Sequence, residues 1–486
     1  MPFFIETPMT NTEKYVGLRE RHPVFCYESF IYSTTTDGLL VKFRFTAGNV
    51  IVFEPETLIC NRPFIDFAHL SAQQYATLAF HIGMVELISY WKCVCSPKVV
   101  IKPFALDKEQ IAFWKKLYFN GLGEFFYING ISATIDDFMQ IDCEGERHLQ
   151  PVDFDVNTDQ YLVPIGGGKD SVVTLELLRR GGYAIRPLII NPRGATTQCS
   201  EKAGFAPDEV FEIRRTIHPT LLKLNAEGYL NGHTPFSAML AFYTLLASAL
   251  TGYANIALSN ESSANEATVI GTSVNHQYSK SLEFENDFRT YVHRYISTKF
   301  NYFSFLRPLS ELQIAMLFAQ NKQYFSVFRS CNAGSKQNIW CCNCPKCLFA
   351  FIILSPFIEP ATMERIFGKN LLNDSAMQRY FDELTGQAPT KPFECVGTID
   401  EVNAALLMTK NRFYNGTQVP LLLSQCHSNA PLPDLGIANN ENNLLSELKL
   451  LLNKEIAEVA ANISITDSTT AGKYENKIVY LHNSIK

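Results

Sequence analysis

Residues 163–173 read Val-Pro-Ile-Gly-Gly-Gly-Lys-Asp-Ser-Val-Val and predict a buried strand, a glycine turn and a helix in succession. The apolar run at 161–165 is typical of a strand, and residues 171–180 repeat their apolar side chains with helical spacing. Three glycines allow positive φ angles and a close approach of the backbone to a ligand. Amides at the start of a helix, which is also its positive dipole end, bind anions. The stretch therefore predicts a phosphate-binding loop.

The loop is not a Walker A motif, which needs a glycine separated by four residues from the Gly-Lys pair and a Ser or Thr after that pair. Val163 and Asp170 stand at those two positions. Residues 166–171 instead resemble the Ser-Gly-Gly-x-Asp-Ser loop of the ATP pyrophosphatase (PP-loop) superfamily, with Gly166 in place of the first Ser. The resemblance implies that ATP is cleaved between its α and β phosphates, with AMP transferred to a substrate oxygen.

The same resemblance implies a role for each loop residue. The loop amides and the Lys169 ammonium would hold the leaving pyrophosphate, and Ser171 would donate a further hydrogen bond. Asp170 would help to hold Mg²⁺, which prefers oxygen ligands and phosphates. A glycine-rich connection that holds no ligand is the alternative. The residues expected to bind ATP in this loop are Gly166, Gly167, Gly168, Lys169, Asp170 and Ser171.

The length of 486 residues predicts two or three domains, and 47% hydrophobic residues are ample for packed cores. We expect an α/β fold whose core is a PP-loop type parallel sheet with helices on both faces. Alternating apolar residues at 39–45 and a helical stretch at 71–91 precede this core. The predicted domains are an α+β N-terminal domain at 1–155 that helps to recognise substrate, the core at 156–358, and a mostly helical region with a polar tail at 359–486.

Charge and polarity weigh against two classes of partner. The net charge of −6 gives no basic surface for nucleic acid. Residues 1–6 have neither a basic nor a sustained apolar leader pattern, so we expect a cytoplasmic protein. The longest apolar stretch, 239–258, contains Thr, Ser and Asn, and predicts a buried helix followed by a strand at 254–258, with no membrane span. The oligomeric state is not predicted.

Thirteen cysteines in a cytoplasmic chain are expected to be reduced thiols, so their spacing is informative. Cys331, Cys341, Cys344 and Cys347 form the pattern C-x9-C-x2-C-x2-C, which can close four thiolates around a tetrahedral Zn²⁺. A site with four sulfur ligands is structural because it leaves no open position. Cys342 is then a spare thiol or a competing ligand. Metal-free thiols and an iron–sulfur cluster are the alternatives.

Three polar runs lie between the glycine loop and this cysteine group, at 231–237, 259–266 and 274–285. The first precedes the buried helix, and the second follows the next strand. Both should therefore lie near the carboxyl ends of the strands, where open parallel sheets bind ligands. Asn260 and Glu261 of the second run are expected to contribute to the nucleotide site. The third run supplies the candidate acid–base or ligand residues His276, Lys280, Glu283 and Glu285, although a solvated loop would look much the same.

Together, residues 166–171, 259–266, 274–285 and the Cys-Pro-Lys-Cys run at 344–347 resemble the UDP-N-acetylmuramoyl-L-alanyl-L-glutamate epimerase (MurL) family. The resemblance implies that the terminal L-Glu of UDP-MurNAc-L-Ala-L-Glu is inverted to D-Glu in a cytoplasmic step of peptidoglycan synthesis. ATP would be consumed, and AMP and pyrophosphate released. The implied partner is the UDP-muramoyl dipeptide, with no nucleic acid and no membrane.

An ATP-dependent epimerase is chemically reasonable, because an acyl-adenylate can delocalise the carbanion as an enolate whereas a free carboxylate resists it. His276 and Lys280 are then candidate acid–base groups or phosphate ligands. Glu283 and Glu285 are candidate bases or Mg²⁺ ligands. Cys199, which we expect in a loop, is a further candidate base.

Two other classes of function remain open at this point. One is another PP-loop adenylating enzyme, such as an amidating enzyme like the 7-cyano-7-deazaguanine synthases, which share the loop and the cysteine knuckle, or a tRNA thiolase. The thiolase would need a basic surface that the net charge does not support. The other is a nucleotide sensor without catalysis, against which the Lys169, Asp170 and Ser171 trio argues.

Overall fold

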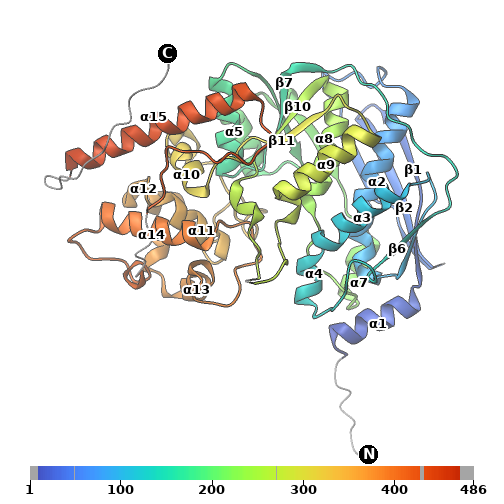
Figure 1. Cartoon of the computed structure of the whole chain (residues 1–486), viewed down its shortest axis with the longest axis horizontal. Coiled ribbons are helices and arrows are strands. Elements are labelled where there is room, and N and C mark those ends of the chain that lie inside the picture. The colour runs from blue at the N-terminus through green and yellow to red at the C-terminus, as the bar shows by residue number, and fades with distance from the viewer. Residues whose placement is uncertain (1–8, 49, 270, 427–431, 471–486) are drawn as a thin grey trace, which may run out of the picture.

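The computed structural model describes residues 9–48, 50–269, 271–426 and 432–470 (Figure 1). The leader pattern tested at residues 1–6 and the end of the predicted polar tail lie outside these residues. Within them, every helix is too short or too polar to cross a membrane.

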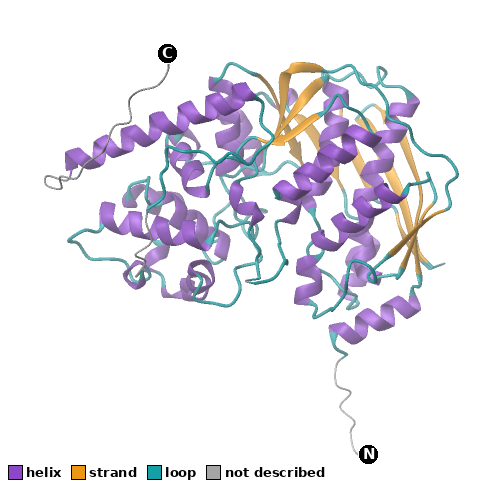
Figure 2. Cartoon of the chain, viewed as in Figure 1, coloured by secondary structure: helices purple, strands orange, loops and turns teal. Residues whose placement is uncertain are grey.

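The strands join in a single sheet (Figure 2). They are β1 (Val24–Thr35), β2 (Gly38–Ala47), β3 (Ile51–Phe53), β4 (Glu56–Cys60), β5 (Lys98–Ile101), β6 (Gln140–Cys143), β7 (Asn157–Pro164), β8 (Ala184–Ile190), β9 (Phe211–Arg215), β10 (Tyr253–Leu258) and β11 (Asn301–Ser304). Their order is β11-β10-β7-β8-β9-β4-β2-β1-β5-β6, with β3 paired to β2. The half from β11 to β9 is parallel. β4 then joins β9 to β2 by antiparallel pairing.

Helices cover both faces of this sheet and extend beyond it (Figure 1). They are α1 (Asn11–Arg21), α2 (Ala72–Val94), α3 (Lys108–Gly121), α4 (Gly123–Ile128), α5 (Lys169–Arg180), α6 (Gly194–Lys202), α7 (Pro219–Ala226), α8 (Phe236–Thr251), α9 (Leu282–Tyr295), α10 (Glu311–Ala319), α11 (Pro345–Leu354), α12 (Pro360–Phe367), α13 (Gln378–Thr385), α14 (Ile399–Phe413) and α15 (Ser446–Thr470). In Figure 1 the helices α11 to α15 lie to the left of the sheet, where α11, α14 and α15 pack against α10.

The sheet separates two hydrophobic cores because successive side chains of a strand point to opposite faces. On β7, Leu162 packs in the core with α2 and α8. Its neighbours Tyr161 and Val163 pack in the other core, which contains α5, α10 and the C-terminal helices. β10 divides in the same way at Ile256 and Ala257. The parallel half of the sheet is therefore buried on both faces, as its continuous apolar strands require.

The structure confirms the α/β class and several local predictions. The strand and helix expected on either side of the glycine turn are β7 and α5, and the helix expected at 71–91 is α2. The apolar stretch 239–258 divides into α8 and β10, as predicted. After residue 359 the described residues contain helices and no strand. The domain borders near residues 155 and 358 stay predictions, and both the sheet and the first core include residues on either side of 155.

Candidate active site

The parallel half of the sheet has one point where the strand order reverses. From β7 the chain continues to β8 and β9 on one side, whereas β10 and β11 lie on the other side. In open α/β sheets, ligands bind in the crevice at the carboxyl ends of the two strands that flank such a point. A cavity of about 890 Å³ opens there, and residues that follow both β7 and β10 line it.

The glycine turn after β7 (residues 166–171) contributes every residue except Gly167 to the cavity lining, and we call it the loop wall. Gly167 has a φ of +81°, and a Cβ at this position would lie 2.9 Å from the backbone of Ala195, so only glycine fits. Gly166 has open space where a Cβ would be. Gly168 is the N-cap of α5 and makes no side-chain cap, so the first amides of this helix have no side-chain partner there. An anion in the cavity could bind these amides.

Lys169 is the most constrained residue of the loop wall. Its side chain is 7% exposed, and its ammonium forms ion pairs with Asp170 and with Glu311 at the start of α10. Burial alone would lower the pKa of Lys169, but the two carboxylates outweigh it and raise that pKa. Burial raises the pKa of Glu311 well above its usual value, and Lys169 opposes this shift. The side chains of Lys169, Asp170 and Glu311 thus form a compact group that lines the cavity.

The other residues expected in the nucleotide site also line the cavity. Ser171 donates a hydrogen bond of 3.1 Å from Oγ to the Gly168 carbonyl, which tightens the turn. Asn260 donates to Ser304 Oγ at 3.0 Å. Glu261 is buried beside them, and its backbone carbonyl accepts a hydrogen bond from Arg307. The structure thus brings the two runs that follow β7 and β10 to one cavity.

Cys199 corrects a local prediction. It lies in α6 and not in a loop, it is fully buried, and its Sγ is 3.7 Å from the Gly167 carbonyl. Burial raises the pKa of this thiol to about 12, which keeps it protonated near neutral pH. Cys199 therefore packs beneath the glycine turn and is not suited to act as a base.

A second group of titratable side chains, Glu124, His233, His276 and Cys395, also lines the cavity, and we call it the thiol wall. Glu124 belongs to α4, and the other three residues lie in loops. His276 Nδ1 is hydrogen-bonded to Glu124, and the His233 ring lies 4.3 Å from the His276 ring between centroids. Four separate segments of the chain therefore meet at this wall.

The two histidines of the thiol wall differ in charge. Burial opposes protonation of His276, but hydrogen bonds to Cys395 and Glu124 outweigh it and raise the pKa of His276 to about 9. Burial lowers the pKa of His233 to about 3, and the nearby positive charges of His276, Lys92 and Lys280 add to this shift. Near neutral pH, His276 is thus an imidazolium and His233 is neutral.

Cys395 lies in the loop between α13 and α14, half-buried against the cavity. Burial would raise the pKa of its thiol. The charges of Lys280 and Lys346, together with a hydrogen bond to His276, outweigh burial and lower this pKa to about 6. Cys395 is therefore a thiolate near neutral pH, paired with the His276 imidazolium.

Two residues of the run 274–285 lie away from the cavity. Glu283 is on the outer face of α9, 58% exposed, where it pairs with Lys116 at 2.7 Å. Glu285 is buried on the same helix and pairs with Arg307 at 3.3 Å. The helix begins at Leu282, so its first turn carries these carboxylates away from His276 and Lys280, which do line the cavity. The structure does not bring the four candidates of this run together.

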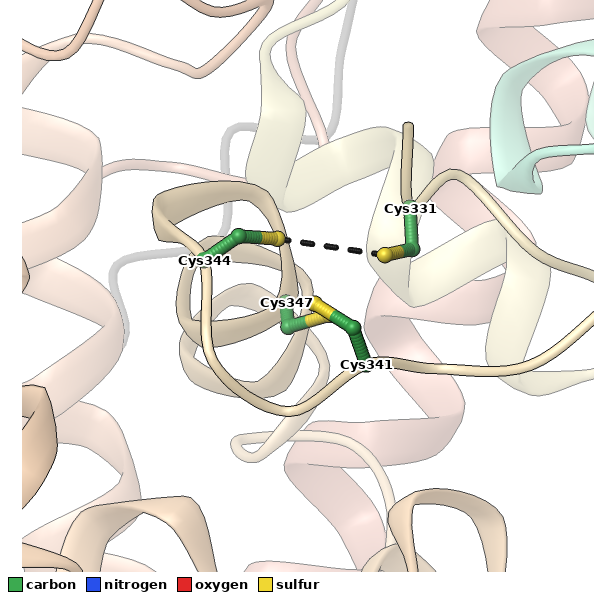
Figure 3. A group of neighbouring side chains, drawn as sticks. All are labelled: Cys331, Cys341, Cys344 and Cys347. Atoms are coloured by element: carbon green, nitrogen blue, oxygen red, sulfur yellow. Dashed lines mark hydrogen bonds between the residues drawn. The ribbon is translucent and has the colours of Figure 1, made fainter. Parts of the chain in front are cut away.

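The four cysteines expected to bind zinc converge (Figure 3). Cys344 and Cys347 lie at the start of α11, and Cys331 and Cys341 come from the preceding loop. The sulfur atoms are 3.9 Å apart for Cys331 and Cys344, and 3.7 Å apart for Cys341 and Cys347. A tetrahedron with Zn–S bonds of about 2.3 Å has edges of about 3.8 Å, so the group has the size of a four-thiolate zinc site.

Cys342 lies outside this group. Its thiol donates to the Phe367 carbonyl at 3.0 Å, and its φ is +50°. The loop also supports the glycine turn, because the amide of Arg329 donates to the Gly167 carbonyl at 2.8 Å. Ser330 lies in contact with Gly168. The cysteine group therefore anchors a segment that buttresses the loop wall.

Comparison with known protein families identifies the chain's relatives. Residues 18–305 match the model of the MurL N-terminal domain, and residues 327–430 match that of the MurL C-terminal domain. The chain belongs to the MurL family. A relative from Xanthomonas oryzae pv. oryzae, named UDP-N-acetyl-alpha-D-muramoyl-L-alanyl-L-glutamate epimerase, is 36% identical over 353 residues, which cover 71% of this chain and 76% of the relative. A relative of the same name from Salinispora tropica is 36% identical over 395 residues, or 79% of this chain and 84% of the relative.

The cavity lies between the regions that the two MurL models match. The N-terminal region supplies the loop wall and the thiol-wall residues Glu124, His233 and His276. The C-terminal region supplies Cys395 and the cysteine group. Both MurL domains are therefore needed to complete the candidate site.

Sequence reasoning missed Glu124, Glu311 and Cys395. Each is an isolated titratable residue without a recognisable pattern around it. His233 lies in the polar run at 231–237, which was expected at the ligand-binding edge but was not singled out residue by residue.

Proposed function

We propose that this chain is an ATP-dependent epimerase that converts the terminal L-Glu of UDP-MurNAc-L-Ala-L-Glu to D-Glu through an acyl-adenylate. The names of the relatives support the substrate and the inversion. The observation that carries the proposal is the cavity itself, which is lined both by a glycine loop suited to bind an anion and by a group of acid–base side chains. One wall suits activation of a carboxylate, and the other suits exchange of a proton.

The loop wall would receive ATP in the manner of the PP-loop superfamily, to which we assign the core. The free amides at the start of α5 would bind the leaving pyrophosphate, and Lys169 would supply a positive charge after exchanging a carboxylate partner for phosphate. The carboxylates of Asp170 and Glu261 line the same cavity and offer oxygen ligands that suit Mg²⁺. Bound Mg²⁺ would neutralise charge on the phosphates.

Adenylation explains why inversion of glutamate would need ATP. Removal of the Cα proton beside a free carboxylate would place a second negative charge on a group that is already anionic. An acyl-adenylate carbonyl is neutral, so it can accept the electron pair as an enolate oxygen. Lys280, which lines the cavity beside Glu261 and Cys395, can hold that oxygen by its charge. Water would then release AMP from the inverted product.

We also propose that Cys331, Cys341, Cys344 and Cys347 hold a structural Zn²⁺. The sulfur spacing fits a tetrahedral site, and the amide of Gly334 donates to Cys331 Sγ at 3.2 Å, as amides do to thiolate ligands. The reaction does not pass through this metal. Its proposed role is to hold the segment that supports the glycine turn. The proposed setting is the cytoplasm, with the soluble UDP-linked dipeptide as the partner.

The test is to incubate the purified protein with ATP, Mg²⁺ and UDP-MurNAc-L-Ala-L-Glu in D₂O. AMP, pyrophosphate, and the chirality and deuterium content of the glutamate are then measured. We expect deuterated D-Glu together with AMP and pyrophosphate. Release of AMP and pyrophosphate without inversion would overturn the proposed epimerase activity. It would favour an adenylating enzyme of another kind, such as an amidating enzyme. ATP binding with no turnover would favour a nucleotide sensor.

A further inference from the structure

We propose that Cys395 is the catalytic base that removes the Cα proton, and that His276 and Glu124 are the positioning residues that keep it in the thiolate form. The inference rests on the proposed function and assigns the proton-transfer step of that reaction to named atoms. It is carried by a chain of contacts from Glu124 through His276 to Cys395, three residues that line the same cavity as the glycine loop.

The contacts have the order of a thiol–imidazole–carboxylate triad. Glu124 accepts from His276 Nδ1, which orients the imidazole ring, and the same ring is hydrogen-bonded to the Cys395 side chain. An activated thiol needs this arrangement of a neighbouring base that is itself oriented by a third group. Because the three residues come from α4 and two distant loops, folding of the whole chain is required to assemble it.

The surroundings of Cys395 support a thiolate that faces a substrate. The charged and titratable groups near its sulfur are Lys280, Lys346 and His276, with Glu394 adjacent in the chain. The interactions with Lys280, Lys346 and His276 each lower the pKa of the Cys395 thiol and so stabilise the thiolate. Unlike the buried Cys199, Cys395 retains exposure to the cavity. A substrate bound between the two walls can therefore reach its sulfur.

The proposed step balances as follows. The thiolate takes the Cα proton, so the C–H bond breaks, an S–H bond forms, and the electron pair moves into the enolate of the acyl-adenylate. Return of the same proton restores L-Glu. Protonation on the opposite face by water gives the D centre, and the thiol then passes its proton to the resulting hydroxide. In D₂O the inverted product therefore carries solvent deuterium at Cα.

The first experiment compares the unmodified protein with Cys395→Ser and Cys395→Ala under the D₂O conditions. We expect pyrophosphate release to stay within about tenfold, because the loop wall is intact. Deuterium incorporation and inversion should fall at least about 100-fold, which is the usual contribution of general base catalysis. Cys26→Ser is the matched control, because Cys26 lies on β1, away from the cavity lining, and should not affect either rate.

The outcomes separate this proposal from the proposed function. Inversion within tenfold of normal in both Cys395 variants would overturn the assignment of the base but leave the epimerase in place. Equal loss of pyrophosphate release and inversion would also overturn it, since the thiol would then act in adenylation. Mass spectrometry of the working enzyme should find no acyl group on Cys395. A thioester there would make the residue a nucleophile and not a base.

A second readout does not depend on turnover. The pH dependence of iodoacetamide alkylation at Cys395 should have its midpoint at about 6, whereas Cys26, whose thiol pKa is raised by burial, should react only at higher pH. In Glu124→Gln, the imidazolium loses its negative partner, so the midpoint for Cys395 should rise by at least about one pH unit. An unchanged midpoint would overturn the positioning role of Glu124.

Discussion

The two walls of the cavity are built in opposite ways. The loop wall consists of six consecutive residues in one strand–turn–helix unit, held by a positive φ at Gly167 and by the start of α5. The thiol wall gathers four side chains from separate segments, and its central contact joins residues 152 positions apart. A site for binding phosphate can therefore be local, whereas an acid–base group must be assembled by the fold. If the loop wall serves adenylation and the thiol wall serves proton transfer, substitutions in the two walls should impair different steps of the reaction.

The largest effect is expected at the glycine turn. Gly167→Ala introduces a Cβ 2.9 Å from the Ala195 backbone at a φ of +81°. The turn must therefore move, and its amide N–H groups would no longer point toward a bound phosphate. We expect ATP-dependent pyrophosphate release and inversion to fall together by at least about 100-fold. The measurement is the pyrophosphate assay under saturating substrate.

Gly182→Ala provides the matched control for backbone strain. Gly182 also has a positive φ, +78°, but a Cβ there meets open space, and the residue lies in the turn after α5. We expect a loss of about 1–2 kcal/mol in stability and normal pyrophosphate release. If both substitutions inactivate the enzyme to a similar extent, the effect of Gly167→Ala comes from backbone strain in the residue and not from the shape of the glycine turn.

The cysteine group gives the next largest effect and tests whether the loop wall depends on its support. Cys344→Ser removes a proposed zinc ligand, and loss of a structural metal site typically costs about 4 kcal/mol or more. We expect bound zinc to disappear, the thermal midpoint to fall, and pyrophosphate release to drop, because Arg329 and Ser330 no longer hold the turn.

Cys342→Ser should keep both the metal and the activity, because that thiol donates to the Phe367 carbonyl instead. Zinc content by elemental analysis and thermal unfolding distinguish the two variants. A wild-type protein that is purified without a metal and is equally stable would contradict the zinc proposal, and a visible charge-transfer band would indicate an iron–sulfur cluster.

The contrast between the walls also explains how far the sequence could lead. The loop wall was predicted residue by residue because a turn of three glycines before a helix start fixes its own geometry. The four cysteines were predicted because metal ligands crowd into a short, countable spacing. Cys395 and Glu124 could not be predicted, because an isolated residue acquires its role only from the neighbours that the fold supplies. Glu283 and Glu285 were selected because they are close in sequence to His276 and Lys280. The first turn of α9 directs both carboxylates away from the cavity.

A change of pH should have a moderate effect on the rate of inversion relative to the rate of pyrophosphate release. This comparison distinguishes the two walls without any substitution. Below the Cys395 pKa of about 6 the thiolate gains a proton and the base is lost. Above that pKa the thiol stays ionised, so the base is retained on the alkaline side. Inversion should therefore fall about tenfold per pH unit only below about pH 6, measured relative to pyrophosphate release at each pH. A constant ratio of the two rates from about pH 4 to about pH 7 would argue against the thiol wall as the acid–base group.

The smallest catalytic effects are expected on α9, which lies outside both walls, and the two glutamates there form a matched pair. Glu283→Gln breaks an exposed ion pair with Lys116, so stability should change by no more than about 1 kcal/mol. The rates of pyrophosphate release and of inversion should stay within about twofold.

Glu285→Gln leaves Arg307 buried without its charged partner and should lower the free energy of unfolding by about 3 kcal/mol or more. Arg307 in turn donates to the backbone carbonyls of Glu261 and Lys280, so any loss of activity should follow unfolding and not precede it. Activity and thermal unfolding should be measured on the same samples of both variants. A loss of inversion in Glu283→Gln that remains folded would contradict this prediction and would indicate that the Glu283 carboxylate takes part in the reaction.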